Sequence, residues 1–439
     1  MIIGIRREDK NKWERRVPLI PKDLKYLKDK YNIDTIIQPS SIRFINDEEF
    51  TKSGVLVNED LGAADTIFAI KEIPVDFFQK GKTYVYFTHV FKGQSYNIPK
   101  LKKMMELGCN LIDYERILDE NNKRLIFFGK YAGYAGLIKS LHVFGQKLKL
   151  EGIKTPFEKI KHPYQYDSLE EAKAEVRKIG KEIKGDGLPQ TITPLIIGFN
   201  GTGNVSKGAQ EIFDLLPHKI IPADMLTKLH DSLTLDTTNL YKVVFSEQDM
   251  FERKDNLPFN IQDYYNKPEL FQSIFEKYIP FLSIIINCIF WIDKYPRLVT
   301  KEYLTKNYLN QSRRKLKVIG DISCDINGSI EITYKIREPD NPTYTYNFKK
   351  DNFTDGIHNS DGITVIAVDN LPCEFPGESS TEFSSLLRNF VYFIAKTDFT
   401  REFNDLDLPE IIKKALILHK GNLTQDYLYL NKYLEPVEK

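Results

Sequence analysis

Residues 195–210 restrict the possible folds more than any other part of the sequence. They read LIIGFNGTGNVSKGAQ, a strand-like run that passes through a glycine turn into an amphipathic helix. Gly201 permits a tight turn, Gly203 leaves room for a pyrophosphate beside the backbone, and Ser206 takes the third position of the G-x-G-x-x-G pattern. Free N–H groups at the helix start would meet the pyrophosphate charge. The segment predicts a parallel α/β domain that binds a dinucleotide through Gly201, Gly203, Asn204, Val205 and Ser206.

The choice of dinucleotide stays open on the local residues. An acid that holds the ribose of NAD is expected about 20 residues beyond the glycines, and Asp224 is the candidate. Asp224 follows Pro222, and it could instead cap a helix that begins near Met225. Lys219 and Lys228 could equally meet the extra phosphate of NADP. A glycine turn with only a structural role is the alternative to a cofactor site.

Length and composition place the chain among multidomain globular proteins. Its 439 residues exceed what one core usually organises, and 41% hydrophobic with 28% charged residues argues against disorder. The net charge of +1 gives no overall basic field for nucleic acid. The four cysteines lack a C-x-x-C pair, so we expect neither a disulfide framework nor a metal site.

Neither a membrane span nor a leader is expected. The longest apolar run, residues 278–292, contains a proline and is shorter than the roughly 20 residues of a transmembrane helix. We interpret it as a buried strand. The chain is strand-like from its first residues, which leaves no room for a presequence and predicts a cytoplasmic location.

Strand and helix patterns alternate through the first 130 residues, as in a parallel sheet covered by helices. The predicted strands are 2–5, 35–38, 66–70, 84–88 and 110–113, and the predicted helices are 21–31, 97–107 and a long connector at 130–150. Residues 151–190 are polar and predict a surface excursion. A second α/β unit begins at Leu195, with strands at 282–292, 317–322 and 363–368. The stretch from Ser379 onward predicts mainly helices.

Polar residues follow two strands of the first unit at the end where α/β sheets bind ligands. Lys71 and Glu72 follow one strand, His89 follows the next, and Lys92 and Gln94 lie on the turn beyond it. A lysine beside a carboxylate, with a histidine nearby, can move protons at a carbonyl or amine centre. Taken singly, each is an ordinary surface lysine or core histidine, but their shared placement favours a functional site.

Two arginines are candidate clamps for substrate carboxylates, because a guanidinium binds a carboxylate bidentately. Arg16 lies between the first strand and the first helix, and Arg124 follows the strand that ends near Asp113 and Glu115. Either could be an ordinary surface arginine. Asp321 ends a late strand of the dinucleotide unit on the side expected to face the nicotinamide, although it could be a turn residue.

Four motifs carry a resemblance to a known family. They are GIRREDKNKWERRVPL at 4–19, FNGTGNVSKGAQEIF at 199–213, DISCD at 321–325 and VDNLP at 368–372. They resemble the lysine-ketoglutarate reductase portion of α-aminoadipic semialdehyde synthase. That portion is similar to lysine-forming saccharopine dehydrogenase and, more distantly, to alanine dehydrogenase.

The resemblance implies two Rossmann-like domains with parallel sheets and an active site in the cleft between them. Residues 1–150 and 376–439 would form the catalytic domain, and residues 151–375 the dinucleotide domain. The implied reaction condenses L-lysine with 2-oxoglutarate to an imine and reduces it to saccharopine, in lysine degradation. NADPH is the implied hydride donor, as in the animal reductases (saccharopine dehydrogenase, NADP+, L-lysine-forming), with NADH as the alternative.

The resemblance also implies roles for the candidate residues. Lys71 and His89 would carry the proton transfers, and Glu72 and Asp321 would tune their pKa values. The residues expected to bind substrate are Arg16, Lys92, Gln94, Glu115 and Arg124. A glutamate-forming saccharopine dehydrogenase, separate or fused, would act downstream, and a mitochondrial location would follow if a presequence precedes this chain. The competing functions are another amino-acid dehydrogenase of the same fold and a non-catalytic nucleotide-binding sensor module.

Overall fold

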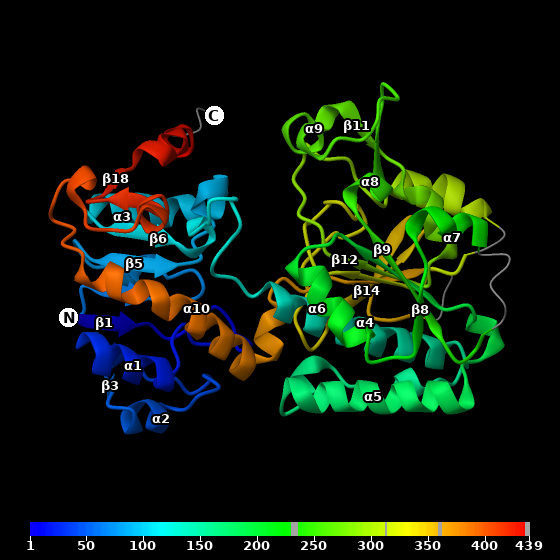
Figure 1. The fold of residues 1–439 in the computed structure, drawn as a ribbon, viewed down its shortest axis with the longest axis horizontal. Coiled ribbons are helices and arrows are strands. Elements are labelled where there is room, and N and C mark those ends of the chain that lie inside the picture. The colour runs from blue at the N-terminus through cyan, green and yellow to red at the C-terminus, as the bar shows by residue number, and fades with distance from the viewer. Residues whose placement is uncertain (230–235, 312–313, 359–361, 435–439) are drawn as a thin grey trace. The chain divides into compact units, whose positions relative to one another are not determined.

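The chain forms two compact α/β units, each built on an eight-stranded, mostly parallel sheet. Unit 1 comprises Met1–Phe128 and Pro376–Lys439, and unit 2 comprises Gly129–Phe375 (Figure 1). The structure, a computed structural model, describes residues 1–229, 236–311, 314–358 and 362–434, except for the side chains of Lys92, Ser95 and Leu229. The predicted fold class, two α/β domains with parallel sheets, is confirmed.

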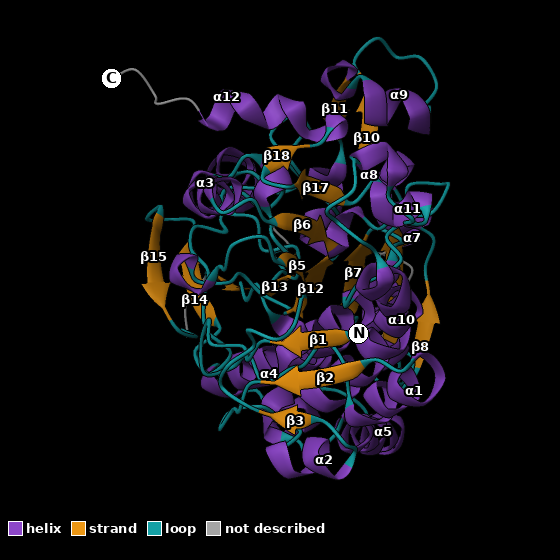
Figure 2. Ribbon diagram, turned by 90° about the vertical axis from the view of Figure 1, so that its left-hand side faces the viewer, coloured by secondary structure: helices purple, strands orange, loops and turns teal. Residues whose placement is uncertain are grey.

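The sheet of unit 1 has the strand order β18-β17-β6-β5-β4-β1-β2-β3, which Figure 2 shows in succession from β18 to β3. Its strands are β1 (Ile2–Ile5), β2 (Asp34–Ile37), β3 (Leu56–Val57), β4 (Thr66–Phe68), β5 (Thr83–Tyr86), β6 (Asn110–Asp113), β17 (Leu416–His419) and β18 (Asn422–Leu423). Strands β1 to β6 pair in parallel, whereas β17 pairs antiparallel with β6 and β18. The carboxyl ends of β1, β4 and β5 therefore meet at one edge of the sheet.

The helices of unit 1 are α1 (Pro21–Tyr31), α2 (Asp47–Lys52), α3 (Ile98–Glu106), α10 (Pro376–Lys396), α11 (Glu410–Lys413) and α12 (Asn431–Leu434). Helix α1 starts on Pro21 and ends at Asn32 in the left-handed conformation, with φ of 52°. The buried carboxylate of Asp23 accepts hydrogen bonds from Ser384 at 2.6 Å and Arg388 at 2.8 Å. These bonds join α10 to α1, so the C-terminal segment completes the first unit (Figure 1).

The sheet of unit 2 has the order β15-β14-β16-β13-β12-β7-β9-β8. Its strands are β7 (Ile196–Asn200), β8 (His218–Ile220), β9 (Leu240–Phe245), β12 (Ile284–Asn287), β13 (Val318–Asp321), β14 (Thr343–Asn347), β15 (Asn352–Asp355) and β16 (Ile363–Ile366). Strands β10 (Phe251–Arg253) and β11 (Phe271–Ser273) form a separate hairpin sheet. Strand β9, rather than β8, lies beside β7.

The helices of unit 2 are α4 (Gly129–Leu150), α5 (Leu169–Asp186), α6 (Asn204–Phe213), α7 (Ala223–Leu229), α8 (Glu247–Met250) and α9 (Ile261–Asn266). Helices α4 and α6 touch backbone to backbone, because a Cβ at Gly133 would overlap the carbonyl oxygen of Val205 and one at Gly208 would overlap that of Lys130. This contact assigns α4 to unit 2. The predicted domain boundary at residue 150 is therefore too late, and the division falls before α4.

Two sequence-based assignments are wrong. The run 278–292 is not one strand, because a 3₁₀ helix covers Phe275–Phe281 and only Ile284–Asn287 is extended. Residues 151–190 contain the 18-residue helix α5, whose N-cap Ser168 accepts from Glu171 N and whose apolar face is buried. The C-terminal stretch is mainly helical, as predicted, and it also contains strand β17, which pairs with β6.

Every helix in the described ranges is too short or too polar to span a bilayer.

Candidate active site

A carboxylate, an imidazole and a lysine gather beside the carboxyl ends of β4 and β5. Glu72 follows β4, His89 follows β5, and the imidazole Nδ1 lies 3.0 Å from Glu72 Oε1. Lys10 Nζ lies 3.3 Å from the other oxygen of Glu72. Burial opposes ionisation of Glu72, but the hydrogen bond with His89 and the charge of Lys10 outweigh it and hold the pKa of Glu72 well below its ordinary value. Glu72 is therefore an anion that orients His89.

His89 lies in a turn whose backbone is fixed by hydrogen bonds of the preceding residue, Thr88. Its φ of 55° is in the left-handed region, which a residue with a Cβ adopts only when its surroundings enforce it. The preceding residue, Thr88, donates from Oγ1 to Asp113 Oδ2 at 2.5 Å, and the next N–H, of Val90, lies 3.2 Å from Thr88 Oγ1. Burial and the neighbouring Glu115 raise the pKa of Asp113 to about 6. Thr88 and Asp113 thus fix the turn that presents a quarter-exposed imidazole.

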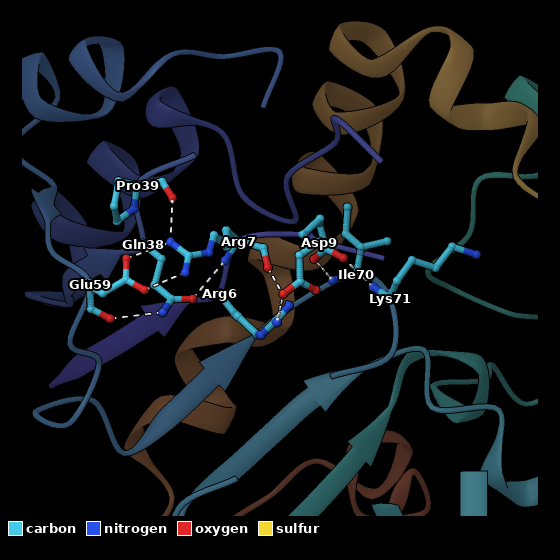
Figure 3. Close-up of polar contacts among 9 residues, drawn as sticks. Arg6, Arg7, Asp9, Gln38, Pro39, Glu59, Ile70 and Lys71 are labelled. Atoms are coloured by element: carbon cyan, nitrogen blue, oxygen red, sulfur yellow. Dashed lines mark hydrogen bonds and ion pairs between the residues drawn. The ribbon is translucent and has the colours of Figure 1, made fainter. Parts of the chain in front are cut away.

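Glu8 supports Lys71 from the loop that follows β1. Its two carboxylate oxygens accept hydrogen bonds from the N–H groups of Ile70 at 2.6 Å and Lys71 at 2.9 Å. Figure 3 shows the Lys71 side chain extending away from Ile70. Burial and the charge of Glu14 raise the pKa of Glu8 to about 7. Lys71 makes no side-chain hydrogen bond or ion pair with any residue that the structure describes, so its ammonium is available to a ligand.

The same loop is anchored by other ion pairs. Arg6 NH2 lies 2.5 Å from Asp9, and Arg7 forms a bidentate pair with Glu59 across the sheet edge (Figure 3). Arg7 N also donates to the Gln38 side chain. The Arg7 contacts join the charged loop after β1 to the loops that follow β2 and β3.

The two candidate clamps already have carboxylate partners in the protein. Arg16 is buried and donates from Nε and NH2 to Glu14 at 2.7 and 2.6 Å, with its guanidinium 4.2 Å from the centre of the Phe128 ring. Arg124 NH2 lies 2.6 Å from Glu115 Oε1, and Arg124 is partly exposed. Burial opposes ionisation of Glu14, but Arg16 outweighs it and lowers the Glu14 pKa. A substrate carboxylate would therefore share these arginines with Glu14 and Glu115.

The remaining predicted substrate residues lie on the turn after His89. Gln94 Oε1 accepts a hydrogen bond from the Tyr96 hydroxyl at 2.7 Å. Lys92 ends a 3₁₀ turn that begins at Val90, and its side chain is outside the described residues. The substrate-binding roles of both remain predictions.

A cavity of about 360 Å³ opens beside Glu72. Two lysines and two carboxylates line it, together with Ile73, Pro74 and Tyr96; the charged residues are Asp9, Lys10, Glu72 and Lys100. Such a mixed lining suits a ligand that carries both carboxylates and an ammonium group.

The glycine turn of unit 2 has the geometry of a phosphate cradle. Gly201 has φ of 91°, which favours glycine, and its N–H donates to Phe245 O at 2.8 Å. A Cβ at Gly203 would meet nothing within 4 Å, so space remains above the turn. Helix α6 begins there, and no side chain caps its first N–H groups. The described residues therefore fit a pyrophosphate group as predicted for Gly201, Gly203, Asn204, Val205 and Ser206.

Three polar side chains form a row across the carboxyl ends of β7, β12 and β13. Asn287 is in register with Asn200 on one side and Asp321 on the other. Asn287 Nδ2 donates to Asp321 Oδ1 at 2.8 Å, and Thr333 donates to Asp321 Oδ2 at 2.6 Å. Burial raises the pKa of Asp321. Both polar side-chain atoms of the fully buried Asn200 lack a hydrogen-bond partner among the described residues, as expected of a group that awaits a ligand.

Asp224, the predicted ribose acid, is exposed in the first turn of α7. That helix follows β8, the edge strand of the sheet. The prediction rested on residue spacing alone, and that spacing leads to the helix after β8, whereas β9 is the strand beside β7.

The sequence motifs did not indicate Glu8, Lys10 or Asn200. Glu8 and Lys10 belong to a run of charged residues that is typical of an exposed loop, and nothing in the sequence says that Glu8 is buried. Asn200 had a detectable signal, since an amide that ends an otherwise apolar strand before a glycine turn is unusual.

No group of three or more potential ligands suited to a metal ion occurs among the histidines, cysteines, aspartates and glutamates of the described ranges.

Family models match both parts of the chain. The alanine dehydrogenase/PNT N-terminal domain matches residues 4–135, and the alanine dehydrogenase/PNT C-terminal domain matches residues 269–426. The chain belongs to the alanine dehydrogenase/PNT family. Its resemblance to the saccharopine-forming branch is also confirmed by the relatives described next.

The chain is 38% identical to α-aminoadipic semialdehyde synthase of Arabidopsis thaliana, over 98% of this chain and 41% of that protein. It is 33% identical to the mitochondrial α-aminoadipic semialdehyde synthase of Mus musculus, over 100% of this chain and 48% of that protein. A saccharopine dehydrogenase [NAD(+), L-lysine-forming] of Emericella nidulans is 27% identical over 85% of this chain and 87% of that protein. The chain thus spans less than half the length of the two synthases.

Two solved structures share the fold. An L-alanine dehydrogenase superposes with a TM-score of 0.61 at 16% identity, covering 99% of this chain and all of that one. The transhydrogenase from Sinorhizobium meliloti gives 0.56 at 15% identity, covering 97% of this chain and 100% of that one. The chain therefore has the two-domain α/β fold of these two structures.

Proposed function

We propose that this protein is a lysine-ketoglutarate reductase, which condenses L-lysine with 2-oxoglutarate and reduces the imine to saccharopine. The observation that carries the proposal is the Glu72–His89 contact of 3.0 Å, at the carboxyl ends of two adjacent strands and next in sequence to Lys71. The relatives named α-aminoadipic semialdehyde synthase and saccharopine dehydrogenase support the substrate assignment.

The reaction needs protons at defined atoms. The lysine ε-amine loses a proton and attacks the keto carbon, the resulting carbinolamine takes up a proton and loses water, and the imine carbon then receives hydride. His89 and Lys71 serve these proton transfers. Glu72 holds the imidazole through Nδ1, which leaves Nε2 to face the reacting atoms. The backbone bonds of Glu8 fix the start of the Lys71 side chain.

The substrates bring three carboxylates and, on lysine, an α-ammonium group. Lys10 and Lys100 of the cavity, with Arg16 and Arg124, supply cations, and Asp9 supplies an anion. We assign Lys92, Gln94 and Glu115 to the same substrate site. A bound reduced nicotinamide dinucleotide supplies the hydride, and the glycine turn and Asp321 of unit 2 hold it. NADPH is the donor that the family resemblance implies.

The relatives' length suggests partners and location. Because the chain spans less than half of the synthases it matches, we propose that a glutamate-forming saccharopine dehydrogenase, fused or separate, consumes its product. We keep the cytoplasmic location as a prediction that cell fractionation checks; the mouse relative's name places that protein in mitochondria.

The test follows loss of reduced nicotinamide absorbance with lysine and 2-oxoglutarate together and each alone. We expect oxidation only when both are present. Lys71→Met should lower turnover by more than about a hundredfold without changing cofactor affinity, because a proton-transfer group is lost. The exposed Lys80→Met is the matched control and should keep full activity.

Other outcomes point elsewhere. Oxidation with ammonia and a small keto acid would favour another amino-acid dehydrogenase. Cofactor binding without turnover on any substrate pair would favour a sensor module. Near-normal activity of Lys71→Met would remove Lys71 from the mechanism.

A further inference from the structure

The strand order of unit 2 determines which residues lie beside the adenosine ribose. Dinucleotide-binding sheets have the strand order 3-2-1-4-5-6, in which strand 1 leads into the glycine turn. An acid at the end of strand 2, which lies beside strand 1, accepts a hydrogen bond from the ribose 2′-hydroxyl. Here β7 is the glycine strand, β12 continues the sheet on one side, and β9 lies on the other. The end of β9 is therefore the ribose position.

The end of β9 is tied directly to the glycine turn. Asn200 pairs in register with Phe245, the last residue of β9, and Gly201 N donates to Phe245 O at 2.8 Å. The two residues after Phe245 are Ser246 and Glu247, and helix α8 starts on Glu247 (Figure 1). Ser246 and Glu247 therefore lie beside the glycine turn at the carboxyl end of the sheet, where they could contact a ligand bound to the turn.

Glu247 is the available acid at this position. Asp249, on the same short helix, accepts hydrogen bonds from Ser246 N at 2.8 Å and Ser246 Oγ at 2.6 Å, so it caps α8. The half-buried Glu247 has one long contact, from the Tyr265 hydroxyl at 3.4 Å. Neither carboxylate is ion-paired with a lysine or arginine within the described ranges.

The cations that could have met a 2′-phosphate lie elsewhere. Lys219 is on the edge strand β8, two places from β7, and its Nζ is paired with Asp236 at 2.6 Å. Lys228 is on α7, which follows that edge strand. Two negative charges at the end of β9 would repel a phosphate, whereas a hydroxyl would donate to either of them.

We infer that Glu247 selects NADH over NADPH by accepting a hydrogen bond from the adenosine ribose and repelling a 2′-phosphate. This inference rests on the proposed function in one respect, that unit 2 holds the reduced nicotinamide dinucleotide. It reverses the cofactor preference that the family resemblance implies, and it replaces Asp224 by Glu247 as the ribose acid.

The test measures dissociation constants of NADH and NADPH by nicotinamide fluorescence, with the full chain and no substrate. We expect the natural protein to bind NADH at least about tenfold more tightly than NADPH. In Glu247→Gln the ratio should shrink, chiefly because NADPH binds more tightly, and in Glu247→Arg it should reverse. Because lysine and 2-oxoglutarate are left out, failure of the two-substrate assay would not change this result.

Two further variants sharpen the comparison. Glu252→Gln removes an exposed carboxylate from the neighbouring strand β10, where it accepts from Gln272, and should leave the ratio unchanged. Asp224→Asn represents the competing position. Equal or tighter binding of NADPH by the natural protein, an unchanged ratio in Glu247→Gln, or a ratio that moves with Asp224→Asn instead would each overturn the inference.

Discussion

At the scale of single residues, the site depends on carboxylates that the protein buries for different purposes. Glu72 is held as an anion against His89 and Lys10, whereas Glu8 uses both oxygens to bind backbone N–H groups. Burial raises the pKa of Glu8 to about 7, while His89 and Lys10 overcome burial and lower that of Glu72. The surroundings of these two acids thus shift their pKa values in opposite directions.

Glu8 gives a prediction about stability and pH. Its pKa is raised from 4.5 to about 7, so the folded protein binds this proton more tightly than the unfolded chain. The stabilisation is complete below the unfolded pKa and is lost as the pH rises through the folded value. The difference in unfolding free energy between the natural protein and Glu8→Gln should therefore fall as the pH rises from about 5 to about 8. Urea unfolding at several pH values measures this difference.

Glu59→Gln is the matched control, because Glu59 forms an exposed ion pair with Arg7, the residue before Glu8. A surface pair contributes little to stability, so its difference should change less with pH. Glu8→Gln should also reduce turnover, since a glutamine has one carbonyl oxygen for the two N–H groups of Ile70 and Lys71. A stability difference that grows with pH would contradict the assigned role of Glu8.

At the scale of elements, the contact between α4 and α6 depends on two glycines. A Cβ at Gly133 would overlap Val205 O and lie 2.6 Å from Ala209 N, both of which are backbone atoms that cannot move alone. Gly133→Ala should therefore cost about 1–3 kcal/mol of unfolding free energy. Thermal melts followed by circular dichroism measure the loss.

Gly185 provides the comparison with the opposite sign. It is exposed in the last turn of α5, and a Cβ there would meet nothing within 4 Å. Gly185→Ala should stabilise the protein by about 0.5–1 kcal/mol, because alanine loses less backbone entropy in a helix. Equal effects of the two substitutions would show that close packing of α4 on α6 does not limit stability.

The sequence predicted elements well where a pattern was local. Short apolar runs with clear ends predicted the strands at Ile2–Ile5 and Asn110–Asp113 and the strand that leads into the glycine turn. It failed where the deciding partner is distant in the chain. Strand β17 is recognisable only beside β6, and α5 hides its buried Val176, Ile179 and Ile183 among lysines and glutamates. Lys71, Glu72 and His89 could be predicted from strand ends, but Glu8 and Glu247 required the burial and strand order of the folded protein.

At the scale of the whole molecule, the two units differ in how the chain builds them. Unit 2 is one continuous segment, Gly129–Phe375, whereas unit 1 needs both ends of the chain. Without the C-terminal segment, β6 would lose its partner β17 and the buried Asp23 would lose Ser384 and Arg388. An unpaired strand edge and an uncompensated buried carboxylate are both costly.

This asymmetry predicts the behaviour of fragments. Residues 129–375 expressed alone should melt cooperatively and bind a reduced nicotinamide dinucleotide, because their sheet and glycine turn are complete. Residues 1–128 alone should lack a cooperative transition, and adding residues 376–439 in trans should restore one. Circular dichroism melts of each fragment and of the mixture measure this. A cooperative melt of residues 1–128 alone would mean that the core of the first unit folds without β17 and α10.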